Sequence, residues 1–266
     1  PLFDAPEEAC HGVPIGGEVL TVVVVTCPEA PDDVVVEIGP GLGSLTLGLL
    51  EQAKSVVAIE IDERLATQLP KTVAQFAPEL FAKLSIINGD ALKISELPIP
   101  ATKLIANLPY NISVPVILHF LEKFPSINEV LVMVQAEVGE RLAAAPGSKI
   151  YGVPSVKARF FGEVTQAGTI SRQIFWPVPN VDSVLVRIVR HQQMPNLELK
   201  NNLFAVIDAA FSQRRKTLRS ALSSFLGGSA EVDRVLAHAG VNSGLRGEQL
   251  DLADFMAISE AAQQVG

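Results

Sequence analysis

Residues 32–145 alternate between short runs of β-branched and aliphatic residues and longer stretches in which apolar residues recur at helical spacing. Short continuous apolar runs are typical of strands that are buried on both faces of a parallel sheet. The stretches between them predict the helices that connect such strands. The predicted strands are Val34–Ile38, Ser55–Glu60, Leu84–Ile87, Lys103–Ala106 and Glu129–Gln135.

Capping signals mark the starts of the intervening helices. Ser44 follows a glycine-rich turn and is expected to cap the first helix, and Asp62 is expected to cap the second. The expected helices cover approximately residues 45–54, 62–75, 114–123 and 136–145. Strands that alternate with helices in this way predict a doubly wound α/β sheet.

The pattern changes twice in the second half of the chain. Residues 153–164 and 183–190 are predicted to be strands, and we expect them to pair antiparallel because no helical crossover joins them. After residue 194 every periodic stretch predicts a helix, with C-caps at Gly227, Gly228 and Gly240. The expected helices cover 199–211, 214–226, 230–239 and 248–263.

The length and composition fit a large domain followed by a small one. The chain has 266 residues, 48% of them hydrophobic, which is enough for a sizeable core. We expect one domain over residues 1–194, with an atypical segment at 1–31, and an all-helical domain over 195–266. No apolar run reaches membrane-spanning length, and the start carries no secretory signal, so a cytoplasmic protein is expected.

Charge is distributed unevenly along the chain. The net charge is −8, but residues 1–138 carry −11 and residues 139–266 carry +3. Between Arg141 and Arg219 the net charge is +8. Such asymmetry hints at a face that binds a polyanion, although an unevenly charged solvated surface explains the numbers equally well.

A glycine-spaced turn follows the first predicted strand. Gly39, Gly41 and Gly43 allow a sharp turn and the close approach of the backbone to a ligand. Because the turn opens into a helix, N–H groups at the helix start face the carboxyl edge of the sheet. This is a nucleotide-binding geometry, and by itself it fits either a dinucleotide or S-adenosylmethionine.

Acidic residues end the next two strands. Glu60 lies 17 residues beyond Gly43, where a carboxylate can accept both ribose hydroxyls of a nucleoside bound across the turn. Asp90 ends the third strand and can accept from an adenine amino group. The run Asn88-Gly89-Asp90 is also typical of a turn. The predicted ligand role of Asp90 therefore depends on Glu60 and the glycines, which place ligand-type residues at the two preceding strand ends.

The turn after the fourth strand distinguishes between the two candidate cofactors, a dinucleotide and S-adenosylmethionine. The Asn107 side chain and the Leu108 carbonyl can both accept from an exocyclic amine, which turns the lone pair of that amine toward an electrophilic methyl group. Tyr110 offers a ring for base stacking, and Pro109 stiffens the turn without adding an N–H. The alternative is a structural strand-to-helix turn, but four residues of this kind favour methyl transfer to an amine.

Five ordered motifs resemble those of the ribosomal RNA adenine N6-dimethyltransferase family, and the resemblance covers approximately residues 33–260. The motifs are Glu37–Thr46, Gly89–Leu92, Asn107–Ser113, Phe175–Ser183 and Ala210–Leu218. Their Gly-Pro-Gly-Leu-Gly and Asn-Leu-Pro-Tyr forms look more like the small-subunit branch than the antibiotic-resistance branch that modifies large-subunit RNA. The resemblance implies a class I, Rossmann-like S-adenosylmethionine-dependent methyltransferase sheet and a small C-terminal all-helical domain.

The family resemblance also implies a reaction. Two methyl groups pass in succession from S-adenosylmethionine to each of two adjacent adenines in the hairpin near the 3′ end of small-subunit (16S) rRNA, as part of ribosome biogenesis. A sulfonium is already a strong methyl donor, so in-line positioning supplies most of the catalysis. The alternatives are adenine methylation of large-subunit rRNA, and a non-catalytic assembly or transcription factor of the same fold.

Roles for individual residues follow from the same resemblance. Tyr110 and Phe175 would sandwich a target adenine that is extruded from its stack. The reacting half of the site comprises Asn107, Leu108, Pro109, Tyr110 and Phe175. The expected cofactor-binding residues are Glu37, Gly39, Gly41, Gly43, Glu60, Ile61, Asp90, Ala91 and Asn107.

The chain departs from the family at its start. The family carries a Gln-Asn-Phe motif before its first strand, in a segment that covers the cofactor, and residues 1–31 lack that motif. We hypothesise that this cover is omitted or disordered here.

Basic residues of the second half are expected to contact RNA phosphates. The first group opens a predicted helix, with Arg215 and Arg219 on one face. Its members are Arg214, Arg215, Lys216 and Arg219. Further candidates are Lys149 and Arg172, and with less weight Lys157 and Arg159. Such contacts give affinity and salt dependence rather than sequence choice. The expected partner is small-subunit rRNA within an assembling ribosomal subunit, bound by a monomer.

Neither a metal site nor a side-chain nucleophile is expected. The histidines are scattered without ligand spacing, and the two cysteines are not in a metal-binding pattern. These residues are His11, His119, His191, His238, Cys10 and Cys27. A reduced compartment is the default for two such thiols.

Overall fold

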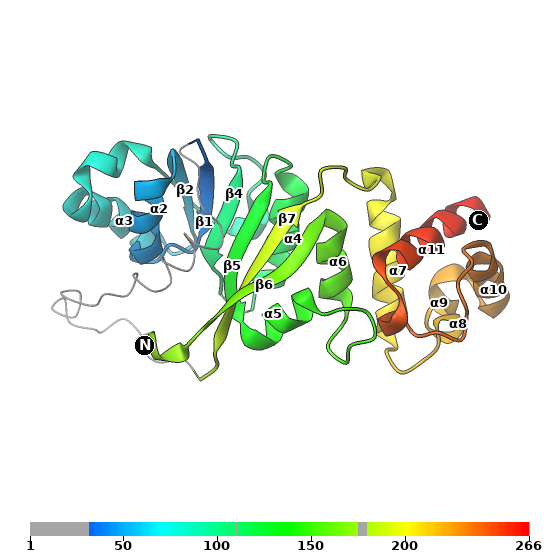
Figure 1. Ribbon diagram of the computed structural model, residues 1–266. Coiled ribbons are helices and arrows are strands. Elements are labelled where there is room, and N and C mark those ends of the chain that lie inside the picture. The colour runs from blue at the N-terminus through cyan, green and yellow to red at the C-terminus, as the bar shows by residue number, and fades with distance from the viewer. Residues whose placement is uncertain (1–31, 110, 175–179, 266) are drawn as a thin grey trace.

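The computed structural model of the chain describes residues 32–109, 111–174 and 180–265 (Figure 1). A seven-stranded sheet forms its centre. The strands are β1 (Val34–Ile38), β2 (Ser55–Glu60), β3 (Leu84–Asn88), β4 (Lys103–Asn107), β5 (Glu129–Gln135), β6 (Gly162–Ile170) and β7 (Ser183–Arg190). Their order across the sheet is β3-β2-β1-β4-β5-β7-β6.

Strands β1 to β5 are parallel, as predicted, and two of them extend one residue beyond the predicted ends. Strand β7 lies between β5 and β6 and is antiparallel to both. The predicted antiparallel partner of residues 183–190 is present, but it is β6 at 162–170 rather than 153–164, and the sheet is mixed. All five parallel strands end at the same edge of the sheet, which is where ligands bind in open α/β folds.

Helices cover both faces of the sheet. They are α2 (Ser44–Gln52), α3 (Glu63–Phe76), α4 (Ser113–Lys123), α5 (Ala136–Ala143) and α6 (Val153–Phe161). One apolar cluster joins α2 and α3 to one face, and a second joins α4, α5 and α6 to the other. The β1 residues alternate between these clusters, with Val34 and Val36 in one and Val35 in the other. This alternation is the period-two pattern of a strand that is buried on both faces.

The capping predictions for the first two helices had different outcomes. Asp62 caps α3, and its side chain accepts a hydrogen bond from the backbone N–H of Arg64 at 2.9 Å. Ser44 does not cap α2, because Gly43 occupies the N-cap position in a left-handed conformation and Ser44 is the first residue of the helix. The turn therefore ends with a glycine that supplies no side-chain cap, a conformation that favours glycine.

The predicted strand over 153–164 is wrong, because most of this segment forms helix α6 and only its end belongs to β6. Gly152 caps the helix, Pro154 lies in its first turn, and Ser155 accepts from the Gly152 N–H at 3.1 Å. Helix α6 is packed against α4, α5 and α7, so its apolar residues are not confined to one stripe. A short apolar run of this kind does not distinguish a buried strand from a buried helix.

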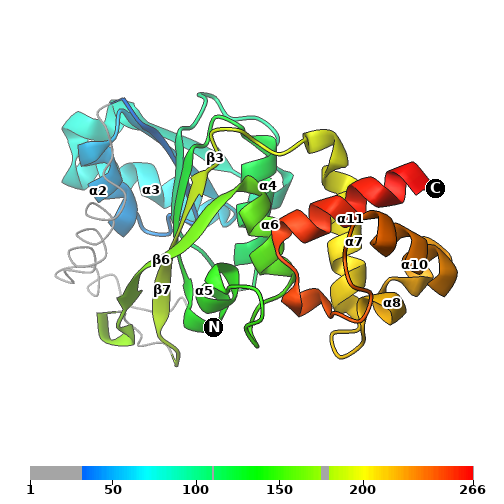
Figure 2. The ribbon, with the colours of Figure 1, turned by 45° about the vertical axis from the view of Figure 1, so that its right-hand side comes forward.

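The rest of the chain is helical, as predicted. It contains α7 (Lys200–Ser212), α8 (Leu218–Ala221), α9 (Ser223–Leu226), α10 (Ser229–His238) and α11 (Leu252–Val265). Figure 2 shows these helices beside α4 and α6, at one side of the sheet rather than over it. Residues of α6 contact α7 and α11, so the larger apolar cluster continues from the sheet into these helices. Within the described residues no helix is both long and apolar enough to cross a membrane.

The predicted helix over 214–226 is also wrong, because residues 213–217 form a turn and only the later part is helical. The backbone N–H of Lys216 bonds to the Gln213 carbonyl at 2.8 Å, and the Leu218 N–H bonds to the carbonyl of Leu245 at 2.7 Å. Tertiary backbone bonds thus compete with the helix at this point, and a run of like charges disfavours helix as well. As a result, Arg215 and Arg219 do not share a helix face.

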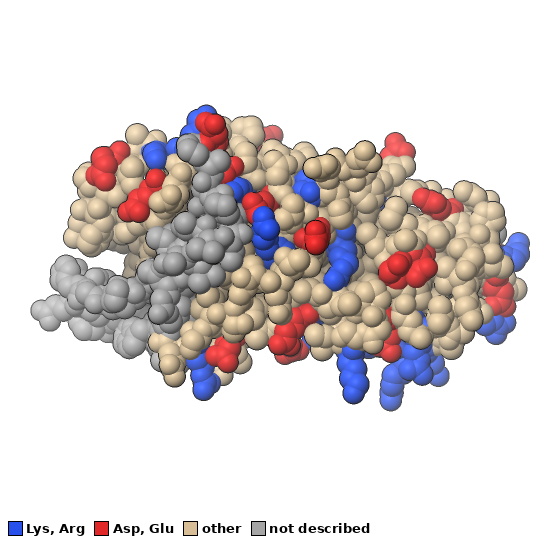
Figure 3. All heavy atoms as spheres, in the orientation of Figure 1, with Lys and Arg blue, Asp and Glu red and all other residues tan. Residues whose placement is uncertain are grey.

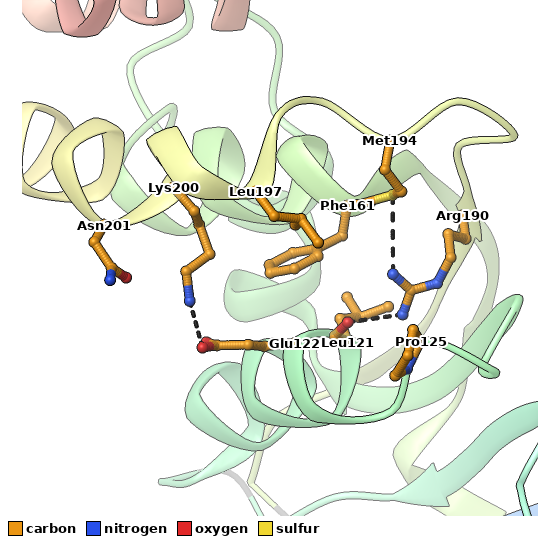
Figure 4. Close-up of a pocket in the computed structure, with 9 residues that line it drawn as sticks. All are labelled: Leu121, Glu122, Pro125, Phe161, Arg190, Met194, Leu197, Lys200 and Asn201. Carbon is orange, nitrogen blue, oxygen red and sulfur yellow. Dashed lines mark hydrogen bonds and ion pairs between the residues drawn. The ribbon is translucent and has the colours of Figure 1, made fainter.

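A cavity of about 360 Å³ lies at the other end of the strands, between α4, β7 and the start of α7 (Figure 4). The Arg190 guanidinium borders it and donates to the carbonyls of Ile127 at 2.5 Å and Leu121 at 2.7 Å. Burial lowers the pKa of Arg190. Arg190 thereby caps the carboxyl end of α4, at the edge of the sheet opposite the strand ends that carry the predicted site.

Candidate active site

The carboxyl ends of β1, β2, β3 and β4 bring the predicted cofactor residues to one edge of the sheet. We call this the cofactor edge and define it by Glu37, the turn at 39–43, Glu60, Asp90 and the turn at 107–109. The four strands are neighbours and parallel, so residues that are distant in sequence become adjacent there.

The glycine turn after β1 needs its glycines. Gly39, Gly41 and Gly43 have φ angles of +68°, +58° and +96°, which side chains rarely adopt. A Cβ atom on Gly43 would also lie only 2.7 Å from Cδ1 of the buried Leu69. The turn is closed by the Gly43 N–H bonding to the Pro40 carbonyl at 3.0 Å. The sequence therefore specifies a backbone loop whose N–H groups and the start of α2 face the strand ends.

Glu60, at the end of β2, holds this loop in place. One oxygen, Oε2, accepts from the Gly41 N–H at 3.2 Å, and the other, Oε1, accepts from the Asp62 N–H at 3.0 Å. The residue is 5% exposed, so the carboxylate is nearly buried but hydrogen-bonded at both oxygens. A carboxylate fixed in this way is oriented before any ligand arrives.

Glu37 is a second buried carboxyl group at the same edge. It is 1% exposed, and its Oε2 accepts from Thr46 Oγ1 at 2.7 Å. Burial raises the pKa of Glu37 to about 8, the Thr46 hydrogen bond opposes the shift, and repulsion from Glu60 adds to it. Near pH 7 Glu37 is therefore mostly protonated, which avoids two buried negative charges beneath one turn. Sequence reasoning missed Thr46, although its position one turn into α2 is a signal for such a bond.

Asp90 and Asn88 line the next strand end. Asp90 caps the short 3₁₀ helix Ala91–Lys93, and its Oδ1 accepts from the Leu92 N–H at 3.0 Å. Asn88 donates from Nδ2 to the Glu60 carbonyl at 2.8 Å. Asp90 thus has a structural role as a turn residue, and it also stands at the predicted edge. Ala91, the neighbouring predicted residue, is buried in the core.

The turn after β4 lies directly beside the glycine turn. A Cβ atom on Gly39 would be 4.0 Å from Cδ of Pro109, which is van der Waals contact. Asn107 is exposed at the end of β4, whereas Leu108 is buried and its N–H bonds to the Met133 carbonyl at 3.1 Å. The predicted reacting and cofactor halves are therefore neighbours. Tyr110 and Phe175 lie outside the described residues.

Two large apolar side chains project from the cofactor edge. Ile61 is 70% exposed and Leu42 is 53% exposed, although each stands next to a buried or backbone-bonded residue of the turn. Exposed aliphatic groups beside a polar edge suit contact with the flat face of a base. Ile61 was among the cofactor-binding residues that the sequence predicted, whereas Leu42 was not.

The basic residues gather at a separate place on the same side of the molecule. The loop before α6 and the turn after α7 both lie at the lower side in Figures 1 and 2, as does the start of α5, which follows the carboxyl end of β5. Figure 3 shows Lys and Arg side chains along this lower side. We call the group the basic surface, and it consists of Lys149, Arg214, Arg215 and Lys216, all exposed.

One member of the basic surface is fixed by the protein itself. Arg214 donates from Nε to Glu248 Oε2 at 3.1 Å and from its other end to the Lys149 carbonyl. The Gly147 N–H bonds to the Glu248 carbonyl at 2.7 Å. Arg215 and Lys216 have exposed side chains and form no side-chain hydrogen bond or ion pair within the described residues.

The other predicted cations have protein partners. Arg219 bonds through Nε to both oxygens of Asp233, at 2.9 and 3.0 Å. Arg172 donates to the Asn180 carbonyl at 3.3 Å, across the base of the β6–β7 connection. The side chain of Lys157 is 14% exposed and pairs with Asp208 at 2.7 Å. These three side chains are therefore less available to RNA than Arg215 and Lys216.

Arg159 and the described histidines are occupied in the same way. Arg159 donates to the carbonyls of Ala143 at 2.9 Å and Ala144 at 2.7 Å, which caps the end of α5. His119, His191 and His238 each have Nε2 within 2.9 Å of a carbonyl oxygen, to which the ring nitrogen donates. No group of three or more metal-ligating side chains occurs in the described part of the chain. His11, Cys10 and Cys27 lie outside that part.

Comparisons with known proteins agree on one family. A family model for ribosomal RNA adenine dimethylase matches residues 18–264. A relative from Leifsonia xyli subsp. xyli, named Ribosomal RNA small subunit methyltransferase A, is 59% identical over 228 residues, which are 85% of this chain and 81% of the relative. A relative of the same name from Corynebacterium glutamicum (strain R) is 54% identical over 246 residues, covering 91% and 84%.

Solved structures give the same fold. A dimethyladenosine transferase from Plasmodium falciparum superposes with a TM-score of 0.77 at 27% identity, covering 90% of this chain and 93% of that one. The 23S rRNA methyltransferase ErmE superposes with a TM-score of 0.69 at 23% identity, covering 93% and 98%. The second similarity speaks for the fold alone.

Proposed function

Because the chain belongs to the ribosomal RNA adenine dimethylase family, we propose that it methylates small-subunit rRNA. The reaction is dimethylation of the N6 amines of two adjacent adenines in the 3′-terminal hairpin, with S-adenosylmethionine as the donor. Relatives that carry the small-subunit name are 50–59% identical, whereas the large-subunit enzyme ErmE is 23% identical. The observation that carries the proposal is that the Gly39 and Pro109 turns are neighbours, at the carboxyl ends of the paired strands β1 and β4.

The residues of the cofactor edge fit S-adenosylmethionine. Glu60 presents a buried carboxylate, already oriented by the Gly41 and Asp62 N–H groups, to the two ribose hydroxyls. Ile61 and Leu42 offer exposed aliphatic surface to the adenine, and Asp90 stands where it accepts from the adenine amine. The turn leaves room for the methionine part at its glycines, which carry no Cβ atoms, and no atom lies within 4 Å of the Cβ position at Gly41.

The chain's own residues then position the target amine. S-adenosylmethionine, when bound, supplies an electrophilic methyl group. The Asn107 side-chain oxygen and the Leu108 carbonyl accept from the N6 amine, which reduces conjugation of the nitrogen with the ring and aims its lone pair at the cofactor edge. Pro109 holds this turn against the glycine turn. Catalysis on this account is mainly orientation, with no side-chain nucleophile.

The basic surface supplies affinity for the rRNA backbone. Arg215 and Lys216 carry exposed, unpaired charges on the same side of the molecule as the cofactor edge, so they suit phosphates that flank the reacting hairpin. The negative net charge of the whole chain is compatible with this, because binding uses a local patch. In this proposal Tyr110 and Phe175 supply the rings that would stack on the extruded adenine.

One experiment tests the function and its rivals. The protein is incubated with methyl-labelled S-adenosylmethionine and with small or large ribosomal subunits from cells that lack these modifications, and the labelled base is then mapped. We expect label on N6 of two adjacent adenines of small-subunit rRNA. Label on large-subunit rRNA would reassign the substrate, and no label on either subunit would favour a non-catalytic binding factor.

A further inference from the structure

The strongest unassigned feature is the contact network that joins three separate segments beneath the basic surface. The segments are the loop before α6, the turn at 213–217 and the 3₁₀ helix Gly247–Gln249. Arg214 bonds to Glu248 and to the Lys149 carbonyl, and the Glu248 carbonyl accepts from the Gly147 N–H. Each segment is thereby tied to both of the others.

We propose that Arg214 and Glu248 form a clasp that presents Lys149, Arg215 and Lys216 as one phosphate-binding surface. In this arrangement Arg214 is a positioning residue, and the phosphate contacts come from the other three cations. The inference rests on the proposed function and assigns different roles within its basic surface. It also gives an acidic residue, Glu248, a positive effect on RNA binding.

The geometry of Arg214 supports this division of roles. Its Nε and its terminal nitrogen already donate to two acceptors on two different segments, so the guanidinium is committed to the protein. Arg215 and Lys216 make no such bonds within the described residues and are exposed. The Lys149 main chain is held by Arg214, whereas its side chain stays exposed at the surface.

The clasp matters because the Arg214 side chain ties the turn at 213–217 to both the loop before α6 and the 3₁₀ helix. Residues 213–217 form a turn rather than a helix, and residues 145–151 are a connection of turns between α5 and α6. Exposed ion pairs add little to stability, but a bonded arginine can fix where neighbouring cations stand. Losing the clasp would let the loop and the turn separate, and the three cations would no longer match one RNA backbone.

Two variants test the clasp against simple electrostatics. Glu248→Gln removes a negative charge near the RNA, so a purely electrostatic surface would bind more tightly. The same variant replaces the charge-assisted bond from Arg214 by a weaker neutral one, and the weakened clasp would bind RNA about fivefold more weakly. Arg214→Lys keeps the charge but cannot donate to both acceptors, so only the clasp predicts weaker binding. Glu231→Gln is the matched control, because Glu231 pairs only with Arg234 on α10 and lies outside the clasp.

Binding is measured with small ribosomal subunits that lack the two dimethyladenines, over a series of salt concentrations. We expect Glu248→Gln and Arg214→Lys to weaken binding with an almost unchanged salt slope, and the double variant to be no weaker than either single one. Arg215→Gln should instead lower the slope by about 1. S-adenosylmethionine affinity and thermal unfolding are measured in parallel. Wild-type values for both would show that the variant keeps an intact sheet.

The outcomes separate the clasp from the proposed function. Equal or tighter binding by Glu248→Gln, together with wild-type binding by Arg214→Lys, would overturn the clasp and leave the function standing. Failure of the wild-type protein to bind small subunits would overturn both. Additive losses in the double variant would mean that Arg214 and Glu248 act separately, which also contradicts the clasp.

Discussion

At the cofactor edge Glu37 and Glu60 are buried and hydrogen-bonded, whereas at the basic surface the cations are exposed and only Arg214 is held. Glu60 accepts from two backbone N–H groups at 3.0 and 3.2 Å, and Glu37 is sealed beneath the turn. Arg215 and Lys216 project from a turn without protein partners among the described residues. At the cofactor edge the acidic side chains are fixed, whereas at the basic surface the clasp fixes the main chain and leaves the cationic side chains able to adjust.

The difference corresponds to two tasks. A small cofactor must be oriented so that its methyl group lies in line with an amine, and orientation requires groups that do not move. An RNA backbone is long and uniform, so cations that adjust to it provide affinity without choosing a sequence. We expect substitutions at the cofactor edge to change rates and stability sharply, and substitutions at the basic surface to change affinity by small steps.

The largest effect is expected for Asn107→Ala at the reacting end of the cofactor edge. We expect single-turnover methyl transfer to fall by about 10²–10³-fold, because the target amine loses one of its two orienting acceptors. The affinity for S-adenosylmethionine, measured by calorimetry, should fall by a much smaller factor. Asn201→Ala, an exposed asparagine on α7 at the opposite edge, is the control. Unchanged turnover in Asn107→Ala would remove the orienting role.

The glycine turn offers a matched pair that tests its rigidity. Gly43→Ala combines a φ of +96° with a clash at 2.7 Å against buried Leu69, and we expect a loss of about 2–4 kcal/mol in unfolding free energy. Gly41→Ala meets no atom within 4 Å and should cost only about 1 kcal/mol, from its φ of +58°. Urea denaturation gives both values. Equal losses would mean that packing against Leu69 does not constrain the turn.

The buried Glu37 predicts a pH dependence of stability. Its pKa is raised from 4.5 to about 8 in the folded protein, so the folded state holds a proton that the unfolded state releases. The stabilisation is complete below about pH 4.5 and is lost as the pH rises through 8. Between pH 6 and pH 8 the wild type should lose about 2 kcal/mol relative to Glu37→Gln, which cannot ionise. Parallel stability curves for the two proteins would refute the buried acid.

The smallest effects are expected among the basic residues, where an exposed cation, Arg215, can be compared with Lys157, whose side chain is only 14% exposed. Arg215→Gln should lower the salt slope of subunit binding by about 1, and Lys157→Gln should leave it unchanged because Lys157 pairs with Asp208 at 2.7 Å. Binding titrations at several salt concentrations measure both slopes. A reduced slope in Lys157→Gln would show that its ion pair opens to RNA.

The sequence predicted the parallel half of the sheet well for a physical reason. Strands β1, β2 and β5 are buried apolar runs that stop at a turn or an acidic residue, so their local pattern and their tertiary environment agree. It failed at α6, which is buried among other helices and therefore lacks a polar face. It failed again at residues 213–217, where bonds to Leu245 and other distant residues decide the conformation.

The site was predictable only in part. Motif spacing placed Gly39, Glu60 and Asn107 at strand ends, and parallel pairing brings those ends together. The spacing did not reveal that Thr46 bonds to Glu37, or that Arg214 serves Glu248 and Lys149. Such pairs join residues through the folded structure. The position of Thr46 near the start of α2 is a weak signal for the first pair, and no local pattern encodes the contacts of Arg214. Tyr110 and Phe175 stay predictions.

The position of β7 has a consequence for synthesis on the ribosome. β5 ends at Gln135, but the strand that covers its free edge, β7, is not complete until Arg190. At about 5–20 residues per second, the edge of β5 waits several seconds for its partner. During that time an apolar strand with unpaired backbone groups is open to mispairing. Slowed elongation between Ala136 and Ser183 should therefore increase aggregation of the nascent chain, and the amount of that aggregation measures how much protection β7 provides.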